Sequence, residues 1–256
     1  MAQYIEVAEA RGRSGLRLAL SIGVPGPWGE SAKGILHVKG IDYAKVAQYP
    51  TMANEELVAW TGHANAPVAV YDDEPPRTGW AEILMLAERI EPSPSLLPAG
   101  ETDRATVFGL AHEICGEMGF GWCRRLGMVG TLLDPALPLD DKARQPARVL
   151  GERYGYSADA AAVASARVAA ITAMLAERLT AQRERGSRYL VGDALTAADV
   201  YWACFAALVR PLPPEQCPMP EMMRPLYDDP SNEFDEVLFE HRDFVYAEHL
   251  ELPMDF

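Results

Sequence analysis

The chain has 256 residues, of which 49% are hydrophobic and 23% are charged, so it can bury a substantial core and is not disordered. Its formal net charge of −14 would repel phosphate backbones and anionic lipid surfaces, which excludes nucleic acid and membrane as expected partners. Residues 1–15 lack the apolar stretch of a signal peptide, and no segment approaches the ~20 consecutive apolar residues of a membrane span.

The cysteine pattern also restricts the function. None of the four cysteines forms a CxxC pair or lies at zinc-site spacing from histidines, so no metal site is expected. All four follow residue 114, which disfavours a disulfide reductase whose active cysteines lie in the front half of the chain. Reduced thiols and the lack of a leader predict a cytoplasmic protein.

The first third of the chain predicts a compact α/β unit. Residues 16–22 alternate apolar and polar side chains as a strand does, and residues 30–39 follow with a helical period that stops at Gly40. A short apolar strand at 66–71 begins with Pro67, a position that a strand tolerates. In chain order the predicted elements are a strand at 16–22, a helix at 30–39, a strand at 43–46, a helix at 54–60, a strand at 66–71 and a helix at 79–90.

The rest of the chain predicts helices only. Residues 91–103 contain three prolines and little periodicity, as an interdomain linker does. We therefore expect an α/β domain at 1–92, a linker at 93–103 and an all-helical domain at 104–256. Helices are predicted at 106–126, 157–185, 196–209 and 232–250, with irregular structure in the proline-rich segment 211–230.

Three segments resemble the glutathione transferase superfamily. Residues 39–43 (KGIDY) are similar to the family's first helix-to-strand turn, and residues 66–68 (APV) to the place where a cis-proline opens a strand. The most specific segment is 189–200 (YLVGDALTAADV), in which Thr196 and Asp199 form a reciprocal cap at the start of a core helix. The resemblance covers residues 16–208 and implies a thioredoxin-like N-terminal domain followed by an all-α C-terminal domain.

The resemblance also implies a chemistry. Members of this family bind glutathione as a cosubstrate in the front domain and stabilise its thiolate, which attacks a small hydrophobic electrophile held by the helical domain. The protein must therefore lower a thiol pKa of ~8.5, by the positive end of a helix or by a hydroxyl donor. The resemblance further implies a homodimer. An alternative is a ligand-binding or structural protein that keeps the fold and has lost the use of glutathione.

The first turn of the predicted helix departs from the family pattern. Gly26 stands where many members carry a serine or cysteine. Trp28 and Ser31 are the candidate catalytic replacements, Trp28 through its indole N–H and Ser31 through its hydroxyl. Trp28 would otherwise line the pocket or cover the domain interface, and Ser31 would otherwise only start the helix.

The resemblance implies further cofactor-binding residues. Pro67 would adopt the cis form, and the backbone of Val68 would pair with the cysteinyl unit of glutathione. Thr78 and Gly79 replace a Glu-Ser pair that holds the γ-glutamyl group, so an acid from Asp72, Asp73 or Glu74 would meet the ammonium group. The electrophile pocket would draw on His112, Glu113, Cys115, Met118, Phe120, Trp122 and Cys123, or these residues would be core. The tail 234–256 would act as a lid over the cleft or complete the core.

Overall fold

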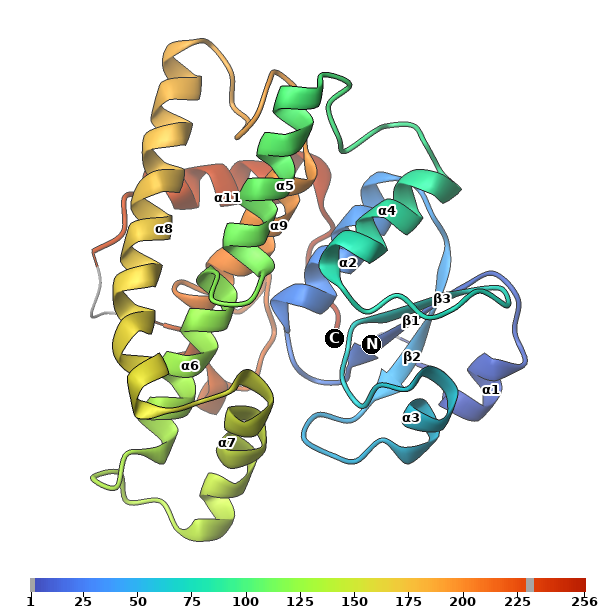
Figure 1. Ribbon diagram of the computed structural model, residues 1–256, viewed down its shortest axis with the longest axis vertical. Helices are drawn as coiled ribbons and strands as arrows, with labels where there is room; N and C mark the ends of the chain where they lie inside the picture. The colour runs from blue at the N-terminus through green and yellow to red at the C-terminus, as the bar shows by residue number, and fades with distance from the viewer. Residues whose placement is uncertain (1–2, 229–232) are drawn as a thin grey trace.

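The computed structural model describes residues 3–228 and 233–256 as an α/β half beside a bundle of helices (Figure 1). The α/β half contains a three-stranded sheet in the order β2 (Tyr43–Gln48), β1 (Leu16–Ser21), β3 (Val68–Tyr71). Strand β1 pairs with β2 in parallel and with β3 in antiparallel. A single bridge between Ala69 and Arg77 extends the far edge of the sheet. The predicted thioredoxin-like order of elements is confirmed.

The two faces of the sheet are covered by different helices. The leucines of β1 pack against α2 (Pro27–Val38) and α4 (Trp80–Ile90), in a core that continues into the helical half. Ala19 on the opposite face belongs to a smaller core under α1 (Val7–Arg11) and α3 (Glu55–Thr61). Because successive strand residues point to opposite faces, β1 contributes side chains to the cores on both sides of the sheet.

The helical half consists of α5 to α11 and two short 3-10 turns, and the connection from α4 to α5 spans residues 91–100. The longer helices are α5 (Glu101–Cys115), α6 (Phe120–Leu133), α7 (Asp141–Tyr154), α8 (Ala158–Glu184), α9 (Ala197–Phe205) and α11 (Val237–His249). A short helix α10 (Arg224–Tyr227) lies in the proline-rich segment, between the 3-10 turn Glu221–Met223 and the undescribed residues 229–232. The domain boundaries proposed from the sequence stay a prediction.

The single helix predicted at 106–126 was wrong, because the chain breaks between Cys115 and Phe120 into α5 and α6. Gly116 and Gly119 bring the backbone close to the end of α5. A Cβ atom on Gly116 would lie 2.4 Å from His112 Nδ1, and one on Gly119 would lie 2.7 Å from the carbonyl oxygen of Glu113. Such close approach is open only to glycine, so the two glycines mark a corner rather than a helix interior.

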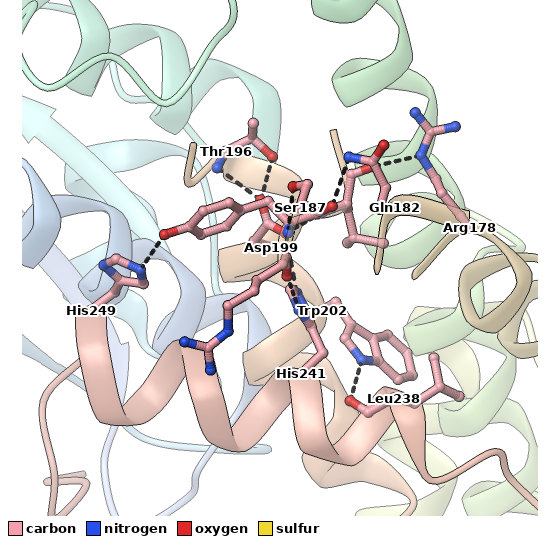
Figure 2. Close-up of polar contacts among 12 residues, drawn as sticks. Arg178, Gln182, Ser187, Thr196, Asp199, Trp202, Leu238, His241 and His249 are labelled. Carbon is pink, nitrogen blue, oxygen red and sulfur yellow. Dashed lines mark hydrogen bonds and ion pairs between the residues drawn. The ribbon is translucent and has the colours of Figure 1, made fainter. Parts of the chain in front are cut away.

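Helix α9 begins at the reciprocal cap that the sequence predicted (Figure 2). Both the backbone N–H and the hydroxyl of Thr196 donate to Asp199 Oδ2, at 2.8 and 2.7 Å. Asp199 Oδ1 accepts from the Leu190 N–H at 2.7 Å and lies 3.1 Å from Nε2 of the buried His241 on α11. The fully buried carboxylate thus ties together the turn before α9, α9 itself and α11.

Helix α8 is long and apolar enough to cross a membrane by length and composition alone. In this fold it contributes buried residues such as Val168, Ile171 and Leu175 to the core, and it packs against α6 and α11. That arrangement is typical of the core helix of a helical domain.

The C-terminal tail does not cover the cleft described below. Helix α11 packs against α9, and the residues after it run back onto α2. The Asp255 carboxylate lies 3.2 Å from Lys33 Nζ and 2.6 Å from Lys45 Nζ, and its carbonyl oxygen accepts from Lys33 at 2.6 Å. The interpretation of the tail as a segment that completes the core is therefore the one that the contacts favour.

Candidate functional site

A cleft of about 590 Å³ lies between the two halves of the molecule. The α/β half contributes the loop before α2, the ends of β1 and β2, and the loop before β3. The helical half contributes one side of α6 and of α7, together with α10. Three of the six candidate site residues line it, namely Trp28, Pro67 and Thr78, whereas Ser31, Val68 and Gly79 do not.

Gly26 is the N-cap residue of α2 and lines the cleft. Its backbone has φ −71° and ψ 119°, which any residue adopts, and a Cβ atom there would meet no atom within 4 Å. The fold therefore leaves room for a serine or cysteine at this position. The absence of a side chain is a property of the sequence and not a steric requirement.

The indole of Trp28 is committed to the domain interface. Its Nε1–H donates to the carbonyl oxygen of Cys115 at 2.9 Å, and its ring packs edge-on against Phe205 with the ring centres 4.8 Å apart. The N–H is thus already bonded and unavailable to a thiolate, while the ring still faces the cleft. Trp28 therefore both lines the cleft and packs in the interface between the two halves.

Ser31 is buried, and its hydroxyl donates to the carbonyl oxygen of Trp28 at 3.0 Å. This bond to the preceding turn of α2 holds the side chain inside the helix surface, away from the cleft. A hydroxyl near the cleft comes instead from Ser21 at the end of β1, which donates to Gln48 Oε1 at 2.6 Å. Ser21 could not be predicted from the sequence, because its position beside the cleft depends on how β1 pairs with β2.

The backbone amides of Trp28 and Gly29 also face this region. None of the hydrogen bonds within residues 3–228 and 233–256 uses either N–H group. They are first-turn amides of α2, which have no partner inside a helix and carry the positive end of its dipole. An anionic atom placed here would be stabilised by backbone rather than by a side chain.

The Ala66–Pro67 peptide bond is cis, as the sequence predicted. Val68, which follows it, is buried in β3 opposite Ala19 and does not reach the cleft. Ala66 does line the cleft, and no bond among the described residues uses its N–H or its C=O. The free backbone therefore precedes the cis bond, and the position expected from Val68 lies with Ala66.

Thr78 and Gly79 begin α4, and their amides already have a partner. Both N–H groups donate to Glu82 Oε2 at 3.0 Å. These bonds from Gly79 and Thr78 lower the pKa of Glu82. A ligand carboxylate at this helix start would have to displace the carboxylate of Glu82.

None of the three acids expected to meet an ammonium group lines the cleft. Asp72 accepts from the Gly15 N–H at 2.7 Å. Glu74 pairs with Arg77 at 3.2 Å and with Arg89 at 2.6 Å. Asp73 is exposed. The one carboxylate in the cleft lining is Glu30, which is held by Lys33 at 2.9 Å.

The helical wall of the cleft is aromatic and contains two arginines. Trp122, Arg125, Arg153 and Tyr154 line it, and the rings of Trp122 and Tyr154 meet at 4.8 Å. Of the residues expected to form the electrophile pocket, only Cys115 and Trp122 do so. Burial raises the pKa of the Cys115 thiol well above its ordinary value, so this thiol is a poor nucleophile.

Two further observations describe what the cleft offers. Within the described part of the chain, no cluster of three or more His, Cys, Asp and Glu side chains is arranged to hold a metal ion. Tyr4, from the segment before β1, lines the cleft with a buried hydroxyl that has no partner among the described residues. A lone tyrosine near the N-terminus gives no sequence signal for that position.

A family model described as the glutathione S-transferase C-terminal domain matches residues 140–223. No curated protein matches the sequence. Solved structures match the whole fold at low identity, each covering 92% of this chain.

Three of these structures illustrate the range. A glutathione S-transferase from Methylobacterium radiotolerans, in complex with glutathione sulfonate, is 18% identical with a TM-score of 0.61 over 92% of its length. The beta-etherase LigF from Sphingobium sp. strain SYK-6 is 18% identical with a TM-score of 0.62 over 96%. Yeast Ure2p in complex with glutathione is 15% identical with a TM-score of 0.60 over 95%. Residues 140–223 thus match the family model of the glutathione S-transferase C-terminal domain, and the chain as a whole shares the two-part fold of solved glutathione transferase structures.

Proposed function

We propose that the cleft binds glutathione and that the protein is a glutathione-dependent transferase or lyase acting on a small hydrophobic electrophile. We also propose that it works in the cytoplasm as a homodimer. Neighbours of this fold include a transferase and a beta-etherase, and two of the structures contain glutathione or glutathione sulfonate. Those properties belong to the neighbours and support the proposal only together with the cleft itself.

The observation that carries the proposal is free backbone at two points on the α/β side of the cleft. Ala66 offers an unpaired N–H and C=O beside cis-Pro67, which fits the pairing of an extended peptide such as the cysteinyl unit of glutathione. On the same side of the cleft, the free amides of Trp28 and Gly29 would face a thiol bound in this way. Backbone at both points makes the site independent of the missing side chain at Gly26.

In this proposal the thiolate is stabilised by the start of α2. The first-turn amides and the dipole of a helix stabilise a nearby anion by about 0.3–2 kcal/mol. Because one pKa unit corresponds to about 1.4 kcal/mol, the expected lowering of the thiol pKa is at most about 1.5 units. The catalysis would accordingly be weaker than in a protein with a hydroxyl donor at this turn, since that donor would add a hydrogen bond to a charged group.

The other candidate residues have supporting roles in this proposal. Trp28 forms one wall for the thiol and joins the two halves through Cys115. Ser31 holds the first turn of α2 through the carbonyl oxygen of Trp28. Pro67 positions Ala66 and Val68 anchors the following strand. Thr78 forms the wall next to the γ-glutamyl group, and Gly79 starts the helix behind it.

A second candidate function is glutathione binding without chemistry. It is favoured by the lack of any side chain at Gly26 and by the carboxylate of Glu82 on the amides of Thr78 and Gly79. One neighbour of this fold is described as the nitrogen regulation fragment of the yeast prion protein Ure2p.

The thiol pKa of bound glutathione separates the two functions. Its ionisation is followed by the ultraviolet absorbance of the thiolate across the pH range around the free value of about 8.5, with S-methylglutathione as the matched control without an ionisable thiol. We expect an apparent pKa lowered by about one unit, together with measurable conjugation of 1-chloro-2,4-dinitrobenzene. Saturable binding with an unchanged thiol pKa and no turnover would overturn the enzyme proposal in favour of the binding protein.

A further inference from the structure

Arg125 on α6 is a buried cation on the helical wall of the cleft. It is 9% exposed and lies one helical turn from Trp122 and from Met128, which also line the cleft. Burial of a guanidinium group is unfavourable unless other groups compensate its charge and satisfy its five N–H donors. The partners of Arg125 therefore decide what this part of the cleft is for.

These partners are weak. Arg125 lies 3.4 Å from the hydroxyl of Tyr227 and 3.6 Å from the sulfur of Met128, and its guanidinium lies 5.4 Å from the centre of the Tyr227 ring. The Tyr154 side chain is a further hydrogen-bonding partner, and none of these groups is a carboxylate. No ion pair within the described ranges 3–228 and 233–256 joins Arg125 to a carboxylate. Two other arginines are buried among the described residues: Arg242 contacts Asp243 at 2.8 Å, whereas Arg17 donates to backbone carbonyl oxygens, including that of Asp72 at 2.7 Å. Among residues 3–228 and 233–256, Arg125 is thus a buried positive charge with no carboxylate bound to it.

The remaining charges of the cleft have the same sign or are already paired. Arg153 on α7 donates to Asn65 Oδ1 at 2.8 Å, across the cleft from one half of the molecule to the other. Among the described residues, Glu30 is the one carboxylate of the lining, and Lys33 contacts both of its oxygens at 2.9 and 3.1 Å. In a protein with a net charge of −14, the helical side of the cleft is thus positive.

Flat aromatic groups surround this charge. The ring of Tyr154 lies 4.8 Å from that of Trp122 and 5.9 Å from that of Trp28. Burial raises the pKa of Tyr154, while the charge of the neighbouring Arg125 acts in the opposite direction. An aromatic ligand can stack or meet these rings edge-on, with its polar end toward the guanidinium.

We propose that the helical side of the cleft binds an aromatic or similarly flat apolar molecule that carries a carboxylate, with Arg125 as its counter-ion and Arg153 at its rim. A guanidinium matches the geometry of a carboxylate because two parallel N–H donors meet the two oxygens. The role of this molecule as the electrophile rests on the proposed glutathione chemistry, but its binding does not. Arg125 thus determines specificity by charge, and the rings determine it by shape.

Carboxylates also belong to glutathione itself, so the test must separate two sources. We use 1-naphthoate and its neutral amide, 1-naphthamide, as a matched pair of probes titrated by calorimetry into the full chain without glutathione. We expect the carboxylate to bind at least tenfold more tightly than the amide to the unmodified protein. The Arg125→Met variant abolishes this preference, and the Arg125→Lys variant, which keeps the charge but not the fork of donors, retains part of it.

Controls make each outcome decisive. Arg148→Met removes an exposed arginine of α7 and keeps the full preference. Melting curves of Arg125→Met establish that it folds, and Arg153→Gln, at a partly exposed position, lowers the preference by about twofold to fivefold without touching the buried charge. Equal affinity for the two probes, or a full preference in Arg125→Met, would overturn the proposal.

The glutathione arm is read separately. Arg125→Met is expected to change the affinity for glutathione by less than twofold, and naphthoate is expected to bind in the presence of saturating glutathione. Displacement of naphthoate by glutathione, together with loss of glutathione binding in Arg125→Met, would assign the charge to glutathione and overturn the proposal. Naphthoate binding in a protein that binds no glutathione would leave this inference standing and sink the proposed function.

Discussion

The starts of α9 and α2 are both helix N-termini that the family resemblance singled out, and their polar groups are arranged in opposite ways. At α9, Asp199 satisfies the hydroxyl and N–H of Thr196 and the N–H of Leu190. At α2, the cap is Gly26, no side chain caps the helix, and the first-turn amides face a cleft. Buried amides need partners within the fold, whereas amides beside a cleft are free to bind a ligand.

This contrast separates folding from chemistry. The segment at α9 has a complete buried cap, and the fold as a whole is similar to solved structures over nine-tenths of the chain. The first turn of α2 has amides that line the cleft and no side chain at Gly26, so the proposed ligand site there depends on backbone alone. A chain can therefore keep its fold while the means of stabilising a thiolate changes.

The largest effect is expected at the start of α9. Asp199→Ala removes the acceptor of three hydrogen bonds and leaves His241 opposite a void, so the free energy of unfolding should fall by about 3–5 kcal/mol. Denaturant unfolding measures the loss. The exposed Asp193→Ala serves as the matched control and should stay within about 0.5 kcal/mol of the unmodified protein. A similarly small change for Asp199→Ala would show that the network contributes little.

The next effect is a gain at the start of α2. Gly26→Ser places a hydroxyl in open space beside the proposed thiolate, and a hydrogen bond to a charged group contributes about 1.5–3 kcal/mol. Turnover of glutathione with 1-chloro-2,4-dinitrobenzene should rise about 10- to 150-fold, with unchanged stability. Gly26→Ala separates the hydroxyl from the mere presence of a side chain. Equal rates in the serine and alanine variants would mean that no thiolate forms at this turn.

A third helix start, that of α4, tests whether an internal carboxylate limits glutathione binding. Glu82→Gln keeps an oxygen acceptor for the amides of Thr78 and Gly79 but removes the negative charge. Affinity for glutathione should rise about twofold to fivefold, since exposed charge interactions contribute about 0.4–1 kcal/mol. Glu177→Gln on the exposed side of α8 is the control. Weaker binding in Glu82→Gln than in this control would show that Glu82 helps the ligand.

The smallest effect is expected from the ion pairs of Asp255 with Lys33 and Lys45. Burial alone would raise the pKa of Asp255, but Lys45 and Lys33 outweigh it and lower that pKa. Because the pKa of Asp255 is lower in the folded state, its interactions with Lys45 and Lys33 stabilise the protein above the unfolded pKa of about 3.9. This contribution is lost as the pH falls through the lower folded-state pKa. Asp255→Asn should therefore lose less stability than the unmodified protein below about pH 4, by less than about 1 kcal/mol because the side chain is 46% exposed. Parallel unfolding curves of the two proteins across this range would contradict the assignment.

Periodicity and caps predicted most of the fold. The strand β1, the glycine that follows α2 and the cap of α9 were predicted from local patterns. Helix α2 ends at Val38, and Gly40 has a φ of 62° two residues later. Short or polar elements escaped prediction. Helix α1 has only five residues, and α7 contains Pro146 inside its span.

The site was harder to predict because its key groups depend on tertiary contacts. The hydrogen bond from the Trp28 N–H to the Cys115 carbonyl oxygen joins two residues that are far apart in the sequence, so the sequence alone does not reveal it. The free backbone lies at Ala66 rather than at Val68 because β3 pairs with β1 from Val68 onward. Arg125 reads as an ordinary helix arginine until its burial without a carboxylate is seen.

Calorimetric titration of the full chain with reduced glutathione tests the central claim most directly, that free backbone at Ala66 and at the start of α2 makes a glutathione site without the usual side chains. We expect saturable binding with a dissociation constant in the millimolar range or tighter, about −4 kcal/mol or stronger. The absence of heat and of any shift in melting temperature up to about 10 mM glutathione, equivalent to binding weaker than about −2.7 kcal/mol, would contradict it.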